Sequence, residues 1–197
     1  MSGFAVVDCE TTGLDPTTDR IIECAIILLD GQGVEENAWS SLVNPRISVR
    51  ASFVHGLYDG DVADAPFFED IAEQVMSLLA GRAFVAHNAN FDAGFLEASL
   101  KRAGIDFSIP PARRVCTMEL SKIYLPEGRH SLQAAAERAG IEQQPEHRAL
   151  ADARIAADLL RCYMSAEARN ERYANYAISR SGQRTYPASW IASLRSQ

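Results

Sequence analysis

Residues 3–14 read GFAVVDCETTGL, an apolar segment that ends on two acidic side chains and a turn. Gly3 to Cys9 predicts a short buried strand, because apolar residues fill positions 4–7. Residues two apart on a strand share a face, so Asp8 and Glu10 are expected to project together. Two carboxylates that close repel each other unless a cation or a proton lies between them. The alternative is a solvated strand end that enters the Thr11-Thr12-Gly13 loop.

The segments that follow show strand and helix patterns in turn. Residues 20–30 and 34–43 predict a hairpin, and residues 83–86 and 115–117 predict two further short strands. Helices are predicted at 65–80 (with Asp64 as N-cap and Pro66 in the first turn), 91–103, the residues up to Tyr124, Ser131 to Gly140, and 150–168 with an extension toward Ile178. The last twenty residues are predicted to be irregular. This order predicts an α/β fold with a mixed sheet covered by helices.

The composition bounds the class of protein. A chain of 197 residues with 47% hydrophobic residues is expected to form one domain with a full core. No apolar run is long enough for a membrane span, and no signal peptide is visible. The four cysteines lack CxxC spacing, which argues against a zinc cluster or a disulfide framework. They favour a reducing compartment, so a cytoplasmic location is expected.

The charge is unevenly distributed. The net charge of −7 disfavours a nucleic-acid partner at first. Residues 161–197, however, hold six arginines against two acids, a net +4, so the first 160 residues carry −11. A negative body also fits a site of carboxylates for divalent cations. The overall charge therefore does not decide the partner.

Two more segments concentrate polar side chains. Residues 86–92, AHNANFD, lead from a short strand into a helix whose first turn contains Asp92. Residues 147–152, HRALAD, place Asp152 near the start of the long helix and His147 on the loop before it. Taken alone, Asp92 could be only a favourable charge at a helix start and His147 only an exposed side chain.

Together these segments supply four carboxylates and one histidine. Hard oxygen ligands suit Mg²⁺ or Mn²⁺. Two such ions about 4 Å apart can stabilise both the attacking and the leaving oxygen of a phosphoryl displacement. A histidine whose ordinary pKa is about 6.5 can take a proton from the attacking water near neutral pH.

The set of motifs resembles the DnaQ-like (DEDDh) 3′→5′ exonucleases, a family that includes the proofreading epsilon subunit of bacterial DNA polymerase III. The resemblance covers about Phe4 to Leu160 and rests on four motifs in order: VDCETTGL at 7–14, VHGL at 54–57, AHNANFD at 86–92 and HRALADA at 147–153. It implies an RNase H-like mixed five-stranded sheet with the first strand central and helices on both faces. The exonuclease domain would span 1–168 and a basic C-terminal extension 169–197.

The resemblance also implies a role for each site residue. Asp8, Glu10 and Asp152 would ligate the tighter-held metal, while Asp8 would bridge to a second metal that Asp92 helps to hold. His147 would be the general base. The residues expected to contact the terminal nucleotide are Glu10 and Thr11 at the 3′-OH, Leu14 as a wedge against the last base, and His55, His87, Asn88 and Phe91 around the pocket.

The implied activity is a metal-dependent 3′→5′ exonuclease on single-stranded DNA ends that releases nucleoside 5′-monophosphates. Two Mg²⁺ or Mn²⁺ ions would be its cofactors, and its role would be proofreading or repair. A DNA polymerase or a second copy of the chain is a candidate partner, and no membrane is expected. An RNA 3′-end trimmer is the first alternative. A non-catalytic nucleic-acid-binding module is the second, although none of the five site residues is lost.

The C-terminal segment departs from the replicative proofreader. No clamp-binding motif of the Gln-x-x-Leu/Met-x-Phe kind follows residue 160. Residues 173–197 instead interleave arginines with Tyr176, Tyr186 and Trp190. They predict either an arm that touches nucleic acid through phosphate contacts and stacking, or an extension that docks its aromatic rings on the body or on a second subunit.

Overall fold

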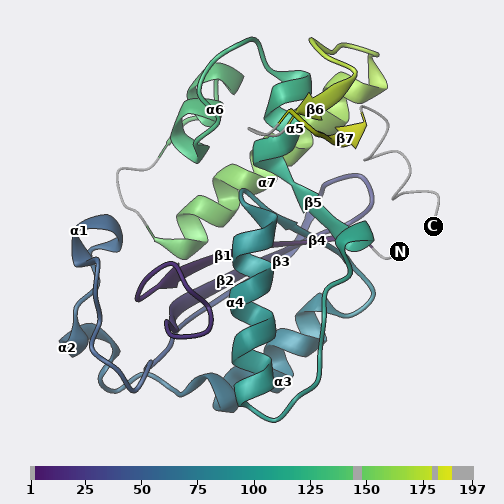
Figure 1. Ribbon diagram of the computed structural model, residues 1–197. Helices are drawn as coiled ribbons and strands as arrows, with labels where there is room; N and C mark the ends of the chain where they lie inside the picture. Colours follow the sequence, from purple (N-terminus) through teal and green to yellow (C-terminus); the bar gives the residue numbers. More distant parts are fainter. Residues whose placement is uncertain (1–2, 144–147, 179–181, 188–197) are drawn as a thin grey trace.

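The computed structural model describes residues 3–143, 148–178 and 182–187 (Figure 1). Five strands form one sheet in the order β3-β2-β1-β4-β5. Their bounds are β1 Phe4–Thr11, β2 Ile21–Leu29, β3 Glu35–Leu42, β4 Ala83–Ala86 and β5 Arg114–Cys116. β2 pairs antiparallel with β1 and β3, whereas β1, β4 and β5 run parallel. The predicted mixed five-stranded sheet with a central first strand is confirmed.

Helices cover both faces of this sheet. The longer ones are α3 Phe68–Leu79, α4 Ala89–Arg102, α5 Thr117–Tyr124, α6 Leu132–Ala139 and α7 Ala149–Ala168. The short ones, which the sequence patterns did not predict, are α1 Ser52–His55, α2 Asp59–Val62 and η1 Pro111–Arg113. Within the described residues, no helix combines the length and the apolar character needed to cross a bilayer.

The alternation along β1 assigns its side chains to two cores. Phe4 and Val6 belong to the core that includes α5, α6 and α7, and Val7 and Cys9 to the core under α3 and α4. Because strand residues two apart share a face, Asp8 and Glu10 lie on the α7 side.

The start of α3 differs from the expectation. The helix begins at Phe68 after Phe67 as N-cap, not after Asp64. Pro66 is engaged elsewhere, because its carbonyl oxygen accepts the Asn44 N–H at 2.9 Å. The Asp70 carboxylate accepts the Phe67 N–H at 2.9 Å, so an acid three residues into the helix caps it.

After α7, the described residues of the C-terminal segment include a two-stranded hairpin that the sequence patterns did not predict. α7 ends at Ala168 and does not extend toward Ile178. Tyr176–Ile178 forms β6, which pairs antiparallel with β7, Arg184–Pro187, so the expectation of irregular chain is wrong over 184–187.

The β6-β7 hairpin packs beside α5. Tyr186 is half-buried against the cores of the body, and its hydroxyl donates to the Arg114 carbonyl at 3.3 Å. Docking on the body is therefore observed for Tyr186, whereas Tyr176 is 41% exposed and lies under the Arg184 guanidinium. Trp190 lies outside the described residues.

Candidate metal centre and nucleotide site

Three carboxylates converge at the carboxyl end of β1. Asp8 and Glu10 project from the strand, and Asp152 lies in the first turn of α7. One oxygen from each side chain lies within 4.8 Å of the other two. Ala25 stands opposite Asp8 on β2, and its methyl group leaves room for the larger side chain. The acids on β1 and the acid on the long helix therefore lie close together, as the sequence motifs predicted.

Asp92 reaches the same end of β1 from α4. Its side chain is 4% exposed, and one carboxylate oxygen accepts the Cys9 N–H at 3.1 Å. Cys9 lies between Asp8 and Glu10, so this bond ties the fourth acid to the strand that carries two of the others. A purely capping role does not account for a bond across 83 positions of sequence.

The acids raise each other's pKa. Burial raises the pKa of Asp8 well above its usual range, and the carboxylates of Asp92, Glu10 and Asp152 raise it further. Burial is also the largest cause of the raised pKa values of Glu10 and Asp92, each about 7. Nearby Arg148 opposes the shift at Glu10, and the N–H of Cys9 opposes the shift at Asp92. The cluster therefore holds its negative charge at a cost that a cation would offset.

This donor set fits a hard divalent cation. All the converging donors are carboxylate oxygens, which Mg²⁺ and Mn²⁺ prefer, and no thiolate or imidazole belongs to the described cluster.

The apo protein is expected to lose stability as the pH rises. The folded-state pKa values of about 7 for Glu10 and Asp92 exceed the unfolded values of about 4, so folding takes up protons in this window. The contribution is complete below about pH 4 and is lost as the pH passes through about 7. Mg²⁺ should therefore raise the Tm by several degrees more at about pH 8 than at about pH 5. Differential scanning fluorimetry with and without EDTA measures this, and an equal Mg²⁺ effect at both pH values would contradict it.

Glu23 and Arg148 support the site and were not singled out from the sequence. Glu23 stands opposite Glu10 on β2 with its side chain 4% exposed. Arg148, the residue before α7, donates to both Glu23 oxygens at 2.7–3.1 Å, and the Ala149 N–H donates at 3.1 Å. The start of α7, three residues before Asp152, is thereby fixed to the sheet. An acid within the apolar run of β2 is the sequence signal that could have revealed it.

Replacing Arg148 with methionine is expected to destabilise the protein by about 2–3 kcal/mol. The change leaves the Glu23 carboxylate buried without its cation, for which a fully buried pair loses about 3–5 kcal/mol. The smaller figure applies because the Arg148 side chain is 44% exposed. The double variant Glu23→Gln with Arg148→Met should recover most of the loss, as measured by urea unfolding. Equal stability of the parent and Arg148→Met would show that the pair does not fix α7.

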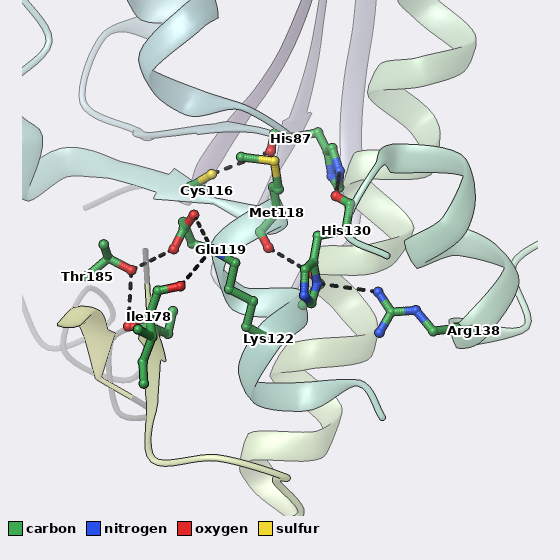
Figure 2. A network of polar contacts seen from close by, with 11 residues as sticks. His87, Cys116, Met118, Glu119, Lys122, His130, Arg138, Ile178 and Thr185 are labelled. Carbon is green, nitrogen blue, oxygen red and sulfur yellow. Dashed lines mark hydrogen bonds and ion pairs between the residues drawn. The ribbon is translucent and has the colours of Figure 1, made fainter. Parts of the chain in front are cut away.

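His87 is a buried neutral histidine (Figure 2). Its two ring nitrogens lie 3.0 Å from the Thr117 hydroxyl and 2.9 Å from the His130 carbonyl oxygen. Burial lowers the pKa of His87 to about 4. Its ring joins β4 to α5 and to the turn before α6, and a direct contact with substrate remains only a prediction.

His55 is likewise engaged within its own turn. Its side chain is 3% exposed, one ring nitrogen lies 3.0 Å from the Arg50 carbonyl oxygen, and the other accepts the Leu57 N–H. The turn itself lines a cavity of about 530 Å³ together with Phe53 and Arg148. Phe53 is 92% exposed, an aromatic surface that the sequence motifs did not single out.

The loop after β1 presents Leu14 to solvent. Leu14 is 84% exposed, while the Thr11 hydroxyl donates to the Gly13 carbonyl at 2.7 Å. Asp19 orders this loop by accepting the Asp15 N–H and the Thr12 hydroxyl. Gly13 has no space for a side chain, because a Cβ there would collide with the Asp19 carboxylate. An exposed apolar side chain on an ordered loop suits contact with a base.

The remaining predicted contacts lie around the start of α4. Asn88 is its exposed N-cap, and Phe91 is half-buried with its ring centroid 4.8 Å from that of Phe95. His147 lies outside the described residues. The structure thus brings together the four acids, whereas the role of His147 rests on the sequence.

Comparison with known proteins places these residues in a family context. The family model described as exonuclease, RNase T, matches residues 5–160. The DNA polymerase III PolC-type of Thermotoga petrophila is 37% identical over 160 residues, 79% of this chain and 11% of the relative. The 3′-5′ exonuclease DinG of Bacillus subtilis is 36% identical over 157 residues, 77% of this chain and 16% of the relative. The chain thus spans only about a tenth to a sixth of the length of these curated relatives.

Solved structures share the fold. Exonuclease X in complex with 5′ overhanging duplex DNA superposes with a TM-score of 0.68 at 26% identity, covering 98% of this chain and 99% of that one. E. coli exonuclease I in complex with a dT13 oligonucleotide has a TM-score of 0.73 at 18% identity, covering 85% of this chain and 42% of that one. The second likeness shows the fold alone.

Proposed function

Because the chain belongs to the DnaQ-like exonuclease family, we propose that it removes nucleotides from the 3′ end of single-stranded DNA. The products would be nucleoside 5′-monophosphates. The convergence of Asp8, Glu10 and Asp152 at one end of β1 carries this proposal. It is the arrangement that a metal-dependent phosphodiester hydrolysis requires.

In this proposal each residue has a separate task. Asp8, Glu10 and Asp152 hold one divalent cation, and Asp8 and Asp92 hold a second. When bound, the ions supply a nucleophilic water and neutralise charge that develops on the scissile phosphate. His147 accepts the proton of that water, and Glu10 with the Thr11 backbone contacts the terminal 3′-OH. Arg148 and Glu23 position the start of α7, and thus Asp152.

The terminal nucleotide would lie between the loop after β1 and the turn after α1. Leu14 offers an exposed apolar contact for the last base. The cavity lined by Phe53, His55 and Arg148 offers space beside Glu10. Asn88 and Phe91, at the start of α4, would contact the nucleotide from the other side, and the buried ring of His87 would support the loop that carries them.

The biological role that fits this activity is proofreading or repair. Relatives named DNA polymerase III PolC-type contain the matching region within a much longer chain. A polymerase is therefore the partner we propose, with a second copy of the chain as the alternative. Co-purification with a polymerase subunit from cells would support the first, and a stable dimer in light scattering the second.

Digestion of matched DNA and RNA oligonucleotides tests the proposed function. Labels at the 5′ or the 3′ end fix the polarity, and parallel reactions in Mg²⁺ and EDTA fix the need for metal. We expect DNA to be shortened from its 3′ end in Mg²⁺ only. Faster cleavage of RNA would make the protein an RNA 3′-end trimmer, and no cleavage of either would favour a non-catalytic binding module.

A further inference from the structure

A cavity of about 520 Å³ lies beside the start of α4, outside the acid cluster. Its walls come from four parts of the chain: the start of α4 (Asn88 and Asn90), residues just before and within β5, the start of α5 (Met118 and Glu119), and β7 (Thr185 and Tyr186). We refer to it as the hairpin cavity. Its last wall belongs to a segment beyond residues 5–160, the part that matches the exonuclease family. The family match therefore does not account for this cavity.

We propose that the hairpin cavity binds a nucleobase of the substrate strand upstream of the nucleotide being removed. The inference rests on the proposed function, and it assigns the C-terminal hairpin as the element that completes the subsite.

Hydrogen bonds to α5 fix the hairpin beside the cavity (Figure 2). The Thr185 hydroxyl donates to a Glu119 oxygen at 2.6 Å, and Lys122 donates to the Ile178 carbonyl at 3.1 Å. The Tyr186 hydroxyl adds its bond to the Arg114 carbonyl. These contacts join both strands of the hairpin to α5 and β5, so the ring of Tyr186 is held in place as a wall.

The position of the cavity relative to the acids suits the 3′ end of a nucleic-acid strand. β1, β4 and β5 run parallel, so their carboxyl ends lie at the same edge of the sheet. Cys116, the last residue of β5, is level with Ala86 of β4 and hence with Val7 of β1, the residue before Asp8. Two strand spacings, about 10 Å, separate β5 from β1 at this level. A nucleic-acid strand covers that distance within about three nucleotides, at about 3.4 Å each. Asn88 lines the cavity and is the N-cap of the helix that carries Asp92 in its first turn, so both sites border the start of α4.

The chemistry of the walls favours a base over a phosphate. The two charged groups in the wall are already paired, Arg114 with Glu97 at 2.8 Å and Glu119 with Lys122 at 2.7 Å. Tyr186 and Met118 offer an aromatic and a polarizable surface for a planar ring. The exposed amides of Asn88 and Asn90 can bond to the polar edge of such a ring. Among the described residues, the only hydrogen bond that these two amides make is the one that the Asn90 oxygen accepts from Arg114. A neutral planar group with a polar rim fits these walls.

The test compares a long and a short substrate. Tyr186→Ala and Met118→Ala should each lower kcat/KM on an oligothymidylate of about ten nucleotides by about tenfold, the effect of losing one base-stacking contact. Neither should change kcat/KM on the p-nitrophenyl ester of thymidine 5′-monophosphate, which has no upstream base. Tyr176→Ala is the matched control, because Tyr176 lies on the same hairpin outside the cavity.

The outcomes separate this inference from the proposed function. Met118 lies outside the hairpin, so Met118→Ala tests the subsite even if Tyr186→Ala disturbs the hairpin. If Met118→Ala lowers kcat/KM equally on both substrates, or on neither, the subsite is overturned. If the unaltered protein cleaves neither substrate, the proposed function fails on its own. Fluorescence anisotropy of the labelled oligothymidylate in Ca²⁺ then decides the subsite, and equal affinities of the parent and both variants overturn it.

Discussion

Asp8→Asn is expected to abolish turnover, by about a thousandfold or more, and at the same time to raise the Tm of the apo protein. The substitution removes the carboxylate whose pKa all three other acids raise, and with it charge stabilisation of several kcal/mol in the transition state. The neutral amide also ends the repulsion that raises the pKa of Asp8. A half-buried charged group that is unfavourable for folding and required for turnover is typical of an active site.

Two measurements check this expectation together. A discontinuous assay on labelled single-stranded DNA gives the loss of turnover, and scanning fluorimetry with and without Mg²⁺ gives the Tm of each state. The Mg²⁺-dependent gain in Tm should disappear in Asp8→Asn and persist in the control Asp106→Asn, an exposed acid beyond the far end of α4. Turnover within tenfold of the parent would show that Asp8 does not hold the metal.

His147→Ala is expected to lower kcat by about a hundredfold to ten-thousandfold while leaving metal binding intact. This range is typical for the loss of a general base. The four carboxylates remain, so the Mg²⁺-dependent gain in Tm should match that of the parent. Added imidazole should restore part of the activity, because a small base can enter the space of the missing ring.

The outcomes for His147 distinguish its possible roles. Loss of the Mg²⁺-dependent gain in Tm would make His147 a ligand and not a base. His130→Ala is the control, since His130 bonds to Ser121 at 2.8 Å and lies in no proposed contact with substrate. Unchanged kcat in His147→Ala would require another proton acceptor.

The regular elements could be predicted because their patterns are local. β1, β2 and β4 each contain a run of at least four apolar residues, and α4 and α7 show helical spacing after polar starts. α1 and α2 have four residues each, too few for a periodic pattern to show. The hairpin β6-β7 escaped prediction because its strands have only three and four residues, and because its contacts are with α5 and β5, distant in sequence.

The residues of the site could likewise be predicted only in part. The four acids could be predicted because strand parity and the order of motifs placed them at one edge of the sheet. The pairing of Glu23 with Arg148 joins residues 125 positions apart. The acid in the apolar run of β2 marks Glu23 as unusual, but no local pattern indicates Arg148 as its partner. For His55 and His87, the motifs predicted a contact with the nucleotide. In the structure, the ring nitrogens of both residues bond within the protein.

The docked hairpin has a consequence beyond the substrate. Strands at the rim of a sheet are templates for pairing with another chain, and proteins that stay monodisperse cover or charge them. β5 is one rim of this sheet, and Tyr186 binds its Arg114 carbonyl. β3 is the other rim, where Glu35 pairs with Arg154 and Glu36 with Arg82. A chain shortened before Tyr176 would therefore expose β5 to intermolecular strand pairing, and aggregation would accompany any change in its enzymology.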